Sequence, residues 1–220
     1  LTFGLAIGNG FIGFIDDFAK VRKKQNAGLS PIGKLIPQFV LAIAYLIGMN
    51  LCGALDTKIT LFFSKQSFDF GIFYYILMTI IIVMMVNAVN ITDGIDGLCG
   101  SVSTLILTFF LFLSIIGAQK ENTVLLSAVI GGLLAFLLFN VHPARCFMGD
   151  TGSLFLGGLL MGYSLVSGYD LLILLLGIVF IIEILSDIIQ VSVFKLSGRK
   201  KRVFKMAPFH HHLEQCNWNE

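Results

Sequence analysis

Two adjacent aspartates are the first residues in the chain that could do chemistry. Asp16 and Asp17 end an apolar stretch, and Lys20 follows four residues after Asp16. If the stretch is helical, Asp16 and Lys20 share a face, so an ion pair at a solvated helix end is one explanation. A reactive site is the other, because adjacent carboxylates repel each other and need a reason to coexist.

A second polar cluster lies between two long apolar stretches. Asn90, Asp93 and Asp96 are spaced three residues apart, so a helical turn would align them. Gly94 and Gly97 permit a close backbone approach or a positive φ where the helix breaks. A capping turn explains one aspartate but not two, since each Asp within a membrane costs about 3 kcal/mol.

A third cluster surrounds Asp150, which stands where a helix N-cap would precede the apolar run that begins at Leu154. The neighbouring residues are Gly149, Thr151, Gly152 and Ser153. Glycines and hydroxyls of this kind suit a loop that wraps phosphate oxygens at a helix N-terminus. A helix cap without further function is the alternative for Asp150.

Three consecutive histidines, His210, His211 and His212, follow a basic run that starts at Lys195. The basic run indicates an anchor beside anionic lipid headgroups. Zinc binding is poorly supported, because adjacent side chains diverge and no fourth ligand is evident. The histidines are better suited to positioning an anion or to proton transfer.

Three polar residues also interrupt the last apolar stretch. Glu183, Asp187 and Gln190 are spaced four and three residues apart, which places them in one stripe on a helix. In a membrane helix, such a stripe faces protein or a water-filled cleft and not lipid.

Clustered aspartates without matching cations call for a divalent metal ion. Oxygen ligands with phosphate as a co-ligand favour Mg²⁺ or Mn²⁺. Such an ion would hold a diphosphate and neutralise its charge during phosphoryl transfer. The residues therefore predict an enzyme in which a soluble nucleotide meets a lipid phosphate at a membrane surface.

The elements that carry these residues must cross a membrane. The chain is 56% hydrophobic and 13% charged, against roughly 25% charged in soluble domains. Apolar stretches occupy residues 1–15, 35–54, 71–89, 98–118, 123–140, 153–168 and 171–194, of which the first is too short for a full span. The predicted fold is an all-α polytopic membrane protein, a single-domain bundle of about seven transmembrane helices.

The distribution of basic residues orients this bundle. The polar segments 16–34, 90–97, 141–152 and 195–220 contain twelve of the fifteen Lys and Arg residues. The positive-inside rule places these segments in the cytoplasm, and all the clusters above lie in them or border them. The opposite segment 55–70, with alternating Thr57, Ile59, Leu61 and Phe63, is expected to form a short external hairpin.

Four motifs in this order resemble the polyprenyl-phosphate N-acetylhexosamine-1-phosphate transferase superfamily. They are Asp16-Asp17-x-x-Lys20, Asn90-x-x-Asp93-Gly-x-Asp96-Gly-Leu, Pro143-Ala-x-x-Phe147-Met-Gly-Asp150-Thr-Gly-Ser and Ala207-Pro-x-His210-His-His-Leu-Glu. The last two motifs are similar to those of its phospho-N-acetylmuramoyl-pentapeptide transferase branch.

This resemblance implies a multi-pass enzyme of the bacterial cytoplasmic membrane with its active site facing the cytoplasm. The enzyme would transfer phospho-MurNAc-pentapeptide from UDP-MurNAc-pentapeptide to undecaprenyl phosphate. Lipid I and UMP would be the products, with Mg²⁺ as cofactor, in the first membrane step of peptidoglycan synthesis. Homodimer formation is also implied, although the sequence identifies no interface.

The resemblance also implies residue roles. Asp16 would deprotonate the lipid phosphate with help from Asp17, and Asp150 would be the main magnesium ligand, together with Asn90. The implied catalytic group is Asp16, Asp17, Asp150, His210, His211 and His212. The implied substrate-binding group is Lys20, Asn90, Asp93, Asp96, Asn140, Phe147 and Gln190, in which Phe147 would stack on the uracil base. Asp187 matches no known role.

Members of this superfamily have ten transmembrane helices. The resemblance therefore implies that residues 1–220 are a fragment, without roughly the first two and a half helices and the last one. The short stretch 1–15, which has no basic region before it, is interpreted as the second half of a helix.

Two other functions are alternatives to this one. A sibling enzyme could use UDP-N-acetylglucosamine, and the Pro-x-His-His-His-Leu-Glu ending argues against it. A channel or transporter would need acids along the whole membrane path, whereas the external half offers them only in loops. The net charge of +2 is too small to suggest a nucleic-acid partner.

Overall fold

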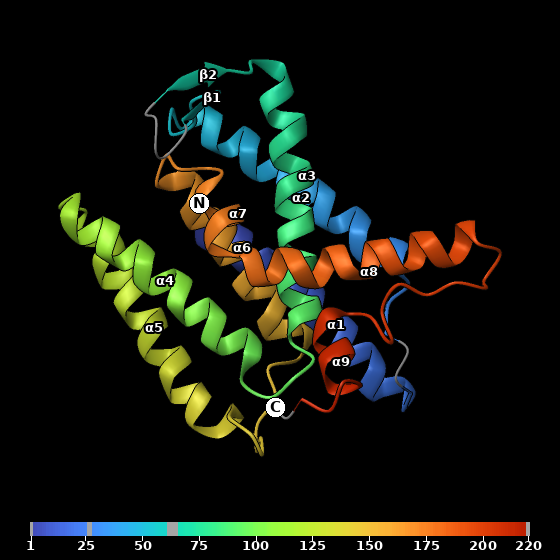
Figure 1. The fold of residues 1–220 in the computed structure, drawn as a ribbon. Coiled ribbons are helices and arrows are strands. Elements are labelled where there is room, and N and C mark those ends of the chain that lie inside the picture. Colours follow the sequence, from blue (N-terminus) through green and yellow to red (C-terminus); the bar gives the residue numbers. More distant parts are fainter. Residues whose placement is uncertain (1, 26–27, 61–65, 219–220) are drawn as a thin grey trace.

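The computed structural model describes residues 2–25, 28–60 and 66–218 and is mostly helical (Figure 1). Its helices are α1 (Thr2–Lys23), α2 (Pro31–Leu51), α3 (Ile72–Thr92), α4 (Leu98–Ile116), α5 (Lys120–Asn140), α6 (Gly149–Val166), α7 (Leu172–Leu176), α8 (Ile178–Leu196) and α9 (Phe209–Glu214). Two short strands, β1 (Lys58–Thr60) and β2 (Ser67–Asp69), lie between α2 and α3.

Four helices in the described part of the chain are long and apolar enough to cross a membrane, namely α2, α3, α4 and α5. These four helices support the expected architecture of a polytopic membrane protein. The remaining long helices carry charge inside or at their ends, for example Asp16 in α1, Asp150 in α6 and Glu183 in α8. These helices bear several of the sequence-predicted site residues, among them Asp16, Asp150 and Gln190.

The centre of the bundle is the close packing of α1 against α6. A side chain at Gly13 would bring its Cβ to 2.1 Å from the backbone oxygen of Asp150. A side chain at Gly158 would bring its Cβ to 2.8 Å from the backbone oxygen of Leu5. Small residues thus let the two backbones approach, as they do in many membrane helix pairs, and the end of α1 meets the start of α6.

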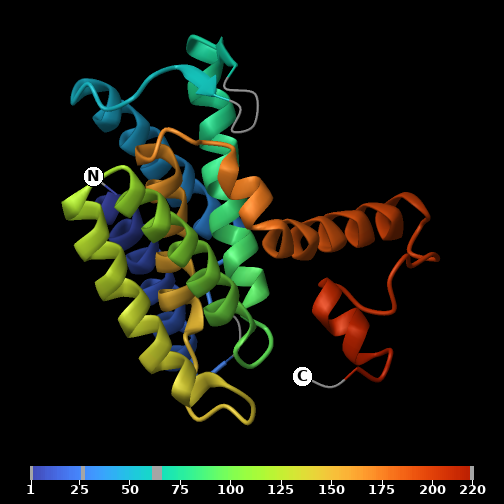
Figure 2. The same ribbon diagram turned by 60° about the vertical axis from the view of Figure 1, so that its left-hand side comes forward.

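The outer helices present apolar side chains to their surroundings. Helices α4 and α5 pack side by side at one edge of the bundle in both ribbon views (Figures 1 and 2). Leu105 of α4 is 71% exposed and Leu138 of α5 is 81% exposed. Such surfaces suit contact with lipid tails and not with water.

The structure breaks the predicted apolar segment 171–194 into two helices. Helix α7 ends at Leu176, Gly177 separates the two, and α8 begins at Ile178. Helix α8 then extends away from the bundle and leads to the C-terminal helix α9 (Figure 2). The prediction of one uninterrupted element here was wrong, because the apolar composition continues through the glycine while the helix does not.

Two local predictions were also wrong. Asn90, Asp93 and Asp96 do not share a helical face, because α3 ends at Thr92 and Gly97 takes a φ of 76° before α4. Asp150 is not an N-cap, because α6 begins one residue earlier, at Gly149.

That earlier helix start has a visible cause. Gly149 has a φ of 66°, a conformation that favours glycine. Met148 then occupies the cap position without a side-chain hydrogen bond to the helix. Asp150 is left free, in the first turn of α6, to point its carboxylate toward α1 and α2.

The expected hairpin between α2 and α3 is present in the described residues. Strands β1 and β2 are antiparallel, with Lys58 opposite Asp69 and Thr60 opposite Ser67. The connecting residues 61–65, which include Leu61 and Phe63, lie outside the described residues.

A buried acid lies at the α6–α7 connection. Asp170 is 5% exposed and accepts a hydrogen bond of 2.8 Å from the Tyr74 hydroxyl. Burial raises the pKa of Asp170 to about 6, and the charge of Asp56 acts in the same direction. The fold therefore favours the neutral form of this carboxyl group.

Replacing Gly13 by Ala should destabilise the protein. The new Cβ would collide with backbone and not with a movable side chain, so we expect a loss of about 2 kcal/mol or more. Thermal unfolding in detergent measures the loss. Gly4→Ala, on the same helix with no atom within 4 Å of the new Cβ, is the control and should be neutral or slightly stabilising. Equal stability of both variants would contradict the tight α1–α6 contact.

Asp170→Asn should raise thermal stability at pH 8 and leave it unchanged near pH 4. Because the pKa of Asp170 is raised in the folded protein, this group loses its proton at a lower pH in the unfolded chain. The free energy of unfolding therefore falls by about 3 kcal/mol as the pH rises from 4 to 6. Asparagine can still accept the Tyr74 hydrogen bond but does not titrate. The exposed Glu121→Gln is the control. A gain of the same size at both pH values would show that ionisation of Asp170 is not its cause.

Candidate functional site

Three carboxylates from two helices form the centre of the candidate site. Asp16 and Asp17 come from the last turns of α1, and Asp150 comes from the first turn of α6. One ligand oxygen from each lies within 4.8 Å of the others. The Asp16 side chain is fully buried, whereas that of Asp17 is 30% exposed. The structure thus brings together residues that are separated by more than 130 positions in the chain.

Two lysines neutralise part of this charge. Lys20 Nζ lies 2.7 Å from Asp16 Oδ2, 3.3 Å from Asp17 Oδ1 and 3.0 Å from Asp150 Oδ2. Lys34 Nζ of α2 lies 3.1 Å from Asp16 Oδ2 and 2.5 Å from Asp150 Oδ2. Three carboxylates face two ammonium groups here, so the network retains a net negative charge.

Backbone and hydroxyl donors fix two of the carboxylates. The amide of Leu29 donates to Asp16 Oδ1 at 2.6 Å. Thr151 donates to Asp17 Oδ2 through its amide at 2.9 Å and its hydroxyl at 2.7 Å. Asp17 therefore caps the start of α6 from the neighbouring helix.

Asn90, at the end of α3, joins the same network. Its Nδ2 donates to Asp150 Oδ1 at 3.0 Å and to Ser153 Oγ at 2.8 Å. A metal would instead need the amide oxygen of Asn90, and exchanging the two ends of the amide group would present it. The geometry thus keeps Asn90 next to Asp150, and its role as a ligand stays a prediction.

The donor set fits a hard divalent cation. The three carboxylates offer only oxygen, lie close together and carry more negative charge than the two lysines balance. Mg²⁺ is commonly held by one or two carboxylates together with substrate phosphates and water. The cluster Asp16, Asp17 and Asp150 could therefore bind a metal ion.

Asp93 lies beside this cluster, in the turn between α3 and α4. Burial raises its pKa to about 7, and repulsion from Asp150 and Asp17 adds to the effect. A perturbed carboxyl group next to a charged cluster is typical of functional sites. The prediction that Asp93 contacts the substrate is compatible with this position.

Asp96 and Asn140 connect that turn to the loop before α6. Asn140, which is 4% exposed, accepts from the amide of Gly97 at 3.0 Å and donates to the Cys146 oxygen at 2.8 Å. Asp96 Oδ2 accepts from the amide of Ala144 at 2.9 Å. Both side chains thus hold the 141–148 loop in place.

That loop ends in Phe147, whose side chain is strongly exposed. Its exposed fraction is 74%, unusual for a phenylalanine that follows a well-anchored loop. The ring is therefore accessible for stacking on a planar ligand. Its predicted contact with the uracil base remains a prediction.

The predicted residues of the C-terminal part form a separate group around α8 and α9. Gln190 accepts from the amides of Val203 and Phe204 at 2.9 and 3.0 Å and donates to the Phe204 oxygen at 3.0 Å. It therefore fastens the segment before α9 to α8.

The three histidines of α9 have different surroundings. His210 is buried against Glu183, with Nδ1 3.0 Å from Oε2. His211 Nδ1 lies 2.5 Å from Glu214 Oε2. The ring of His212 packs edge-on to Phe204, at 5.5 Å between centroids. The three side chains therefore have different partners, although the ring centroids of His210 and His211 lie 4.2 Å apart.

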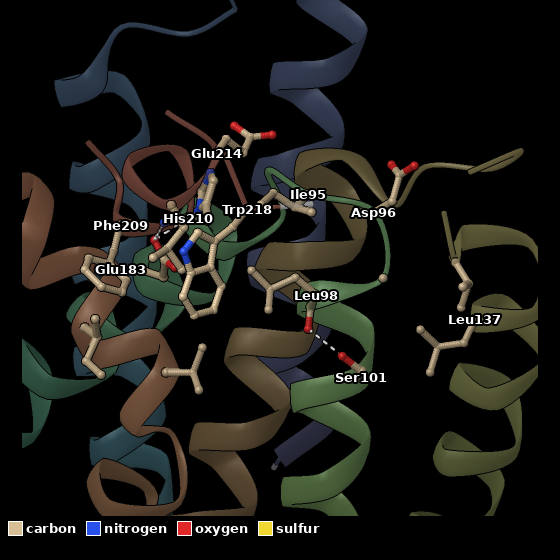
Figure 3. A pocket seen from close by; sticks show the side chains of 15 residues that line it. Ile95, Asp96, Leu98, Ser101, Leu137, Glu183, Phe209, His210, Glu214 and Trp218 are labelled. Carbon is tan, nitrogen blue, oxygen red and sulfur yellow. Dashed lines mark hydrogen bonds and ion pairs between the residues drawn. The ribbon is translucent and has the colours of Figure 1, made fainter. Parts of the chain in front are cut away.

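A cavity of about 590 Å³ lies between the turn before α4, the end of α5 and helices α8 and α9 (Figure 3). Its polar lining includes Asp96, Glu183, His210 and Glu214, and its apolar lining includes Trp218. The three clustered carboxylates do not line this cavity. The site residues thus fall into a charged cluster and a mostly apolar cavity, and the 93–97 turn lies next to both.

Lys34 is a site residue that sequence reasoning missed, since it was counted only as a cytoplasmic charge. A local signal was available. Ser30 caps α2 through a 3.1 Å hydrogen bond from the Gly33 amide, and Pro31 starts the helix. Lys34 therefore stands in the first turn, where the helix dipole disfavours a cation and an acidic partner is needed.

Comparison with known proteins identifies the family. The model of a family described as "Glycosyl transferase family 4" matches residues 1–168, which is most of the chain. The chain belongs to this family.

Individual relatives are more specific. The chain is 44% identical over 216 residues to the phospho-N-acetylmuramoyl-pentapeptide-transferase of Halalkalibacterium halodurans, covering 98% of this chain and 66% of that protein. It is 44% identical over 214 residues to the Clostridioides difficile protein of the same name, covering 97% and 66%. The Shouchella clausii protein of that name is 43% identical over 216 residues, covering 98% and 66%. The predicted resemblance is confirmed, and the chain spans 66% of the length of these relatives.

Lys34→Met should destabilise the protein in metal-free buffer. The change removes a cation from the fully buried Asp16 and from Asp150, and Lys20 replaces it only in part, so we expect a loss of about 2–3 kcal/mol. Thermal unfolding in detergent measures it. Lys58→Met is the control, because its exposed contact with Asp56 is 4.0 Å long and should contribute less than about 0.5 kcal/mol. Losses of similar size would show that Lys34 does not stabilise the cluster.

Proposed function

We propose that the protein containing this chain transfers phospho-MurNAc-pentapeptide from UDP-MurNAc-pentapeptide to undecaprenyl phosphate, with lipid I and UMP as products. The observation that carries the proposal is the cluster of three carboxylates and two lysines at the meeting point of α1, α2 and α6. The names of its relatives support the same reaction.

The reaction joins an oxygen of the lipid phosphate to the sugar-bearing phosphorus of the nucleotide. The diphosphate bond to UMP breaks, and the bond electrons leave with the UMP phosphate. Two anionic substrates must approach each other, so cations are needed beside both. Lys20 and Lys34, already within the cluster, supply two of them to the phosphate oxygens.

The resemblance assigns the removal of a proton from the lipid phosphate to Asp16. In this structure, Asp17 is the more accessible of the two neighbouring carboxylates, since the Asp16 side chain is fully buried. We infer that Asp17 meets the substrate at Oδ1, while Asp16 fixes the two lysines. The Thr151 hydrogen bonds to Oδ2 keep Asp17 oriented.

Asp150 and Asn90 would hold Mg²⁺, with Asp17 next to them. Bound there, the ion supplies charge neutralisation for the diphosphate and for the departing UMP. Asp93, Asp96 and Phe147 border the neighbouring turn and loop, where they would bind the uridine. Asn140, Gln190 and the three histidines support or line the surrounding cleft.

We further propose that the chain is one membrane domain of a longer protein, with about seven spans and its site at the cytoplasmic face of the bacterial cytoplasmic membrane. Four segments that would share that side contain twelve of the fifteen basic residues. The carboxylate cluster draws on three of these segments, which supports their placement at one face. A homodimer remains a prediction from the resemblance.

The test uses the full-length protein in detergent with Mg²⁺, UDP-MurNAc-pentapeptide and undecaprenyl phosphate. We expect UMP and a lipid-linked sugar, and loss of both when EDTA removes the metal. Asp150→Asn should lower the rate by about 100-fold or more, because it removes charge at the reacting phosphates. Glu121→Gln, far along the chain at the exposed start of α5, should retain the parent rate.

Three outcomes would change the proposal. UMP release that does not need the lipid phosphate would refute a transferase. Lipid product from UDP-N-acetylglucosamine but not from UDP-MurNAc-pentapeptide would identify the sibling enzyme that uses UDP-N-acetylglucosamine. Full activity in a folded Asp150→Asn protein would keep the reaction but remove the proposed site.

A further inference from the structure

A buried hydrogen-bonded pair of side chains joins α8 to α9 outside the carboxylate cluster. The side chains of Glu183 and His210 are 5% and 4% exposed. Glu183 Oε2 lies 3.0 Å from His210 Nδ1 and 3.3 Å from the His210 backbone nitrogen. The two side chains lie together at the edge of the cavity, as Figure 3 shows. A buried acidic side chain is unfavourable unless it is well paired, and His210 is the partner of Glu183.

The geometry determines which ring nitrogen carries the proton. The backbone N–H of His210 can only donate, so Glu183 Oε2 acts as an acceptor. When the same oxygen also accepts from the ring, the ring hydrogen lies on Nδ1. Nε2 has no hydrogen-bond partner among the described residues.

The other edge of the His210 ring rests against the turn between α3 and α4. A Cβ added to Gly94 would lie 2.5 Å from His210 Nε2 and 2.9 Å from Cε1. The ring therefore fills the space that a side chain at this position would need. Asp93 and Asp96 are carried by the same turn.

We propose that Glu183 is a positioning residue: it holds the His210 ring against Gly94 and thereby sets the position of the turn that presents Asp93 and Asp96. This role rests on the proposed function, in which that turn binds the nucleotide. The chain of contacts runs from α8 through α9 to the substrate site. Glu183 itself does not touch the reacting atoms.

Two substitutions test the chain of contacts from opposite ends in the full-length enzyme. Glu183→Ala removes the acceptor, and Gly94→Ala pushes the ring away. Both should raise KM for UDP-MurNAc-pentapeptide about 10-fold while kcat changes less than about threefold, because nucleotide binding is disturbed and the carboxylate cluster is not. Glu183→Gln, which keeps an acceptor oxygen without charge, should restore part of the affinity.

Each substitution has a matched control. Asp187→Asn changes a carboxylate one turn further along α8, and Gly131→Ala adds a methyl group to α5 with no atom within 4 Å. Both should leave KM unchanged. If Gly94→Ala or Glu183→Ala lowers kcat with KM unchanged, or neither changes KM, the proposal is wrong. Gly94→Ala alone decides the question if Glu183→Ala does not fold.

A spectroscopic measurement is independent of activity. Nitrogen NMR of the ¹⁵N-histidine-labelled protein should show His210 protonated at Nδ1 in the parent, with its signal identified by loss in His210→Asn. Glu183→Ala should shift the ring toward the Nε2-protonated form that free histidine prefers. An unchanged tautomer would overturn the role of Glu183. A parent that shows the Nδ1 signal but makes no lipid product would contradict the proposed function and leave the Glu183–His210 contact standing.

Discussion

The structure depends on the close approach of α1 and α6, which puts three carboxylates next to one another. Gly13 allows it, since any side chain there would meet the backbone of Asp150. The resulting repulsion would be severe in a membrane environment without cations. Lys20 and Lys34 supply them from α1 and α2, and the amides of Leu29 and Thr151 supply further positive dipoles. Packing and charge balance thus support each other at one point.

This constraint divides the helices into two kinds. Helices α2, α3, α4 and α5 are apolar enough to span a membrane by composition alone. Helices α1, α6 and α8 carry charged residues that need protein partners. Those of α1 and α6 find them in each other and in α2, and Glu183 of α8 finds one in α9. Helix α2 belongs to both kinds, because its apolar body carries Lys34 in its first turn. The charged site is thereby placed at helix ends, where a water-soluble nucleotide could reach it.

Many polar residues in the chain hold loops together. Asn140 and Asp96 fasten the loop before α6 to the turn after α3, and Gln190 fastens the segment before α9 to α8. In an apolar environment, each backbone amide outside a helix needs a partner, and these side chains provide it. Residues of this type position loops, whichever ligand those loops contact. A loss of activity on their substitution would not by itself identify a contact with substrate.

The sequence by itself indicated the helical membrane character, the family and all three residues of the carboxylate cluster. Those conclusions depend on composition, motif order and the cost of charge in lipid, all of which are local properties. Only the tertiary structure decided that Lys34 joins Asp16 and Asp150, that α8 separates from α7 at Gly177, and that Asp93 and Asp96 lie in a turn. It also separated the histidines of α9 into different environments, with His210 against Glu183 and Gly94. The contacts of Lys34 and His210 join segments far apart in the chain, and residue type and spacing do not specify how such segments approach each other.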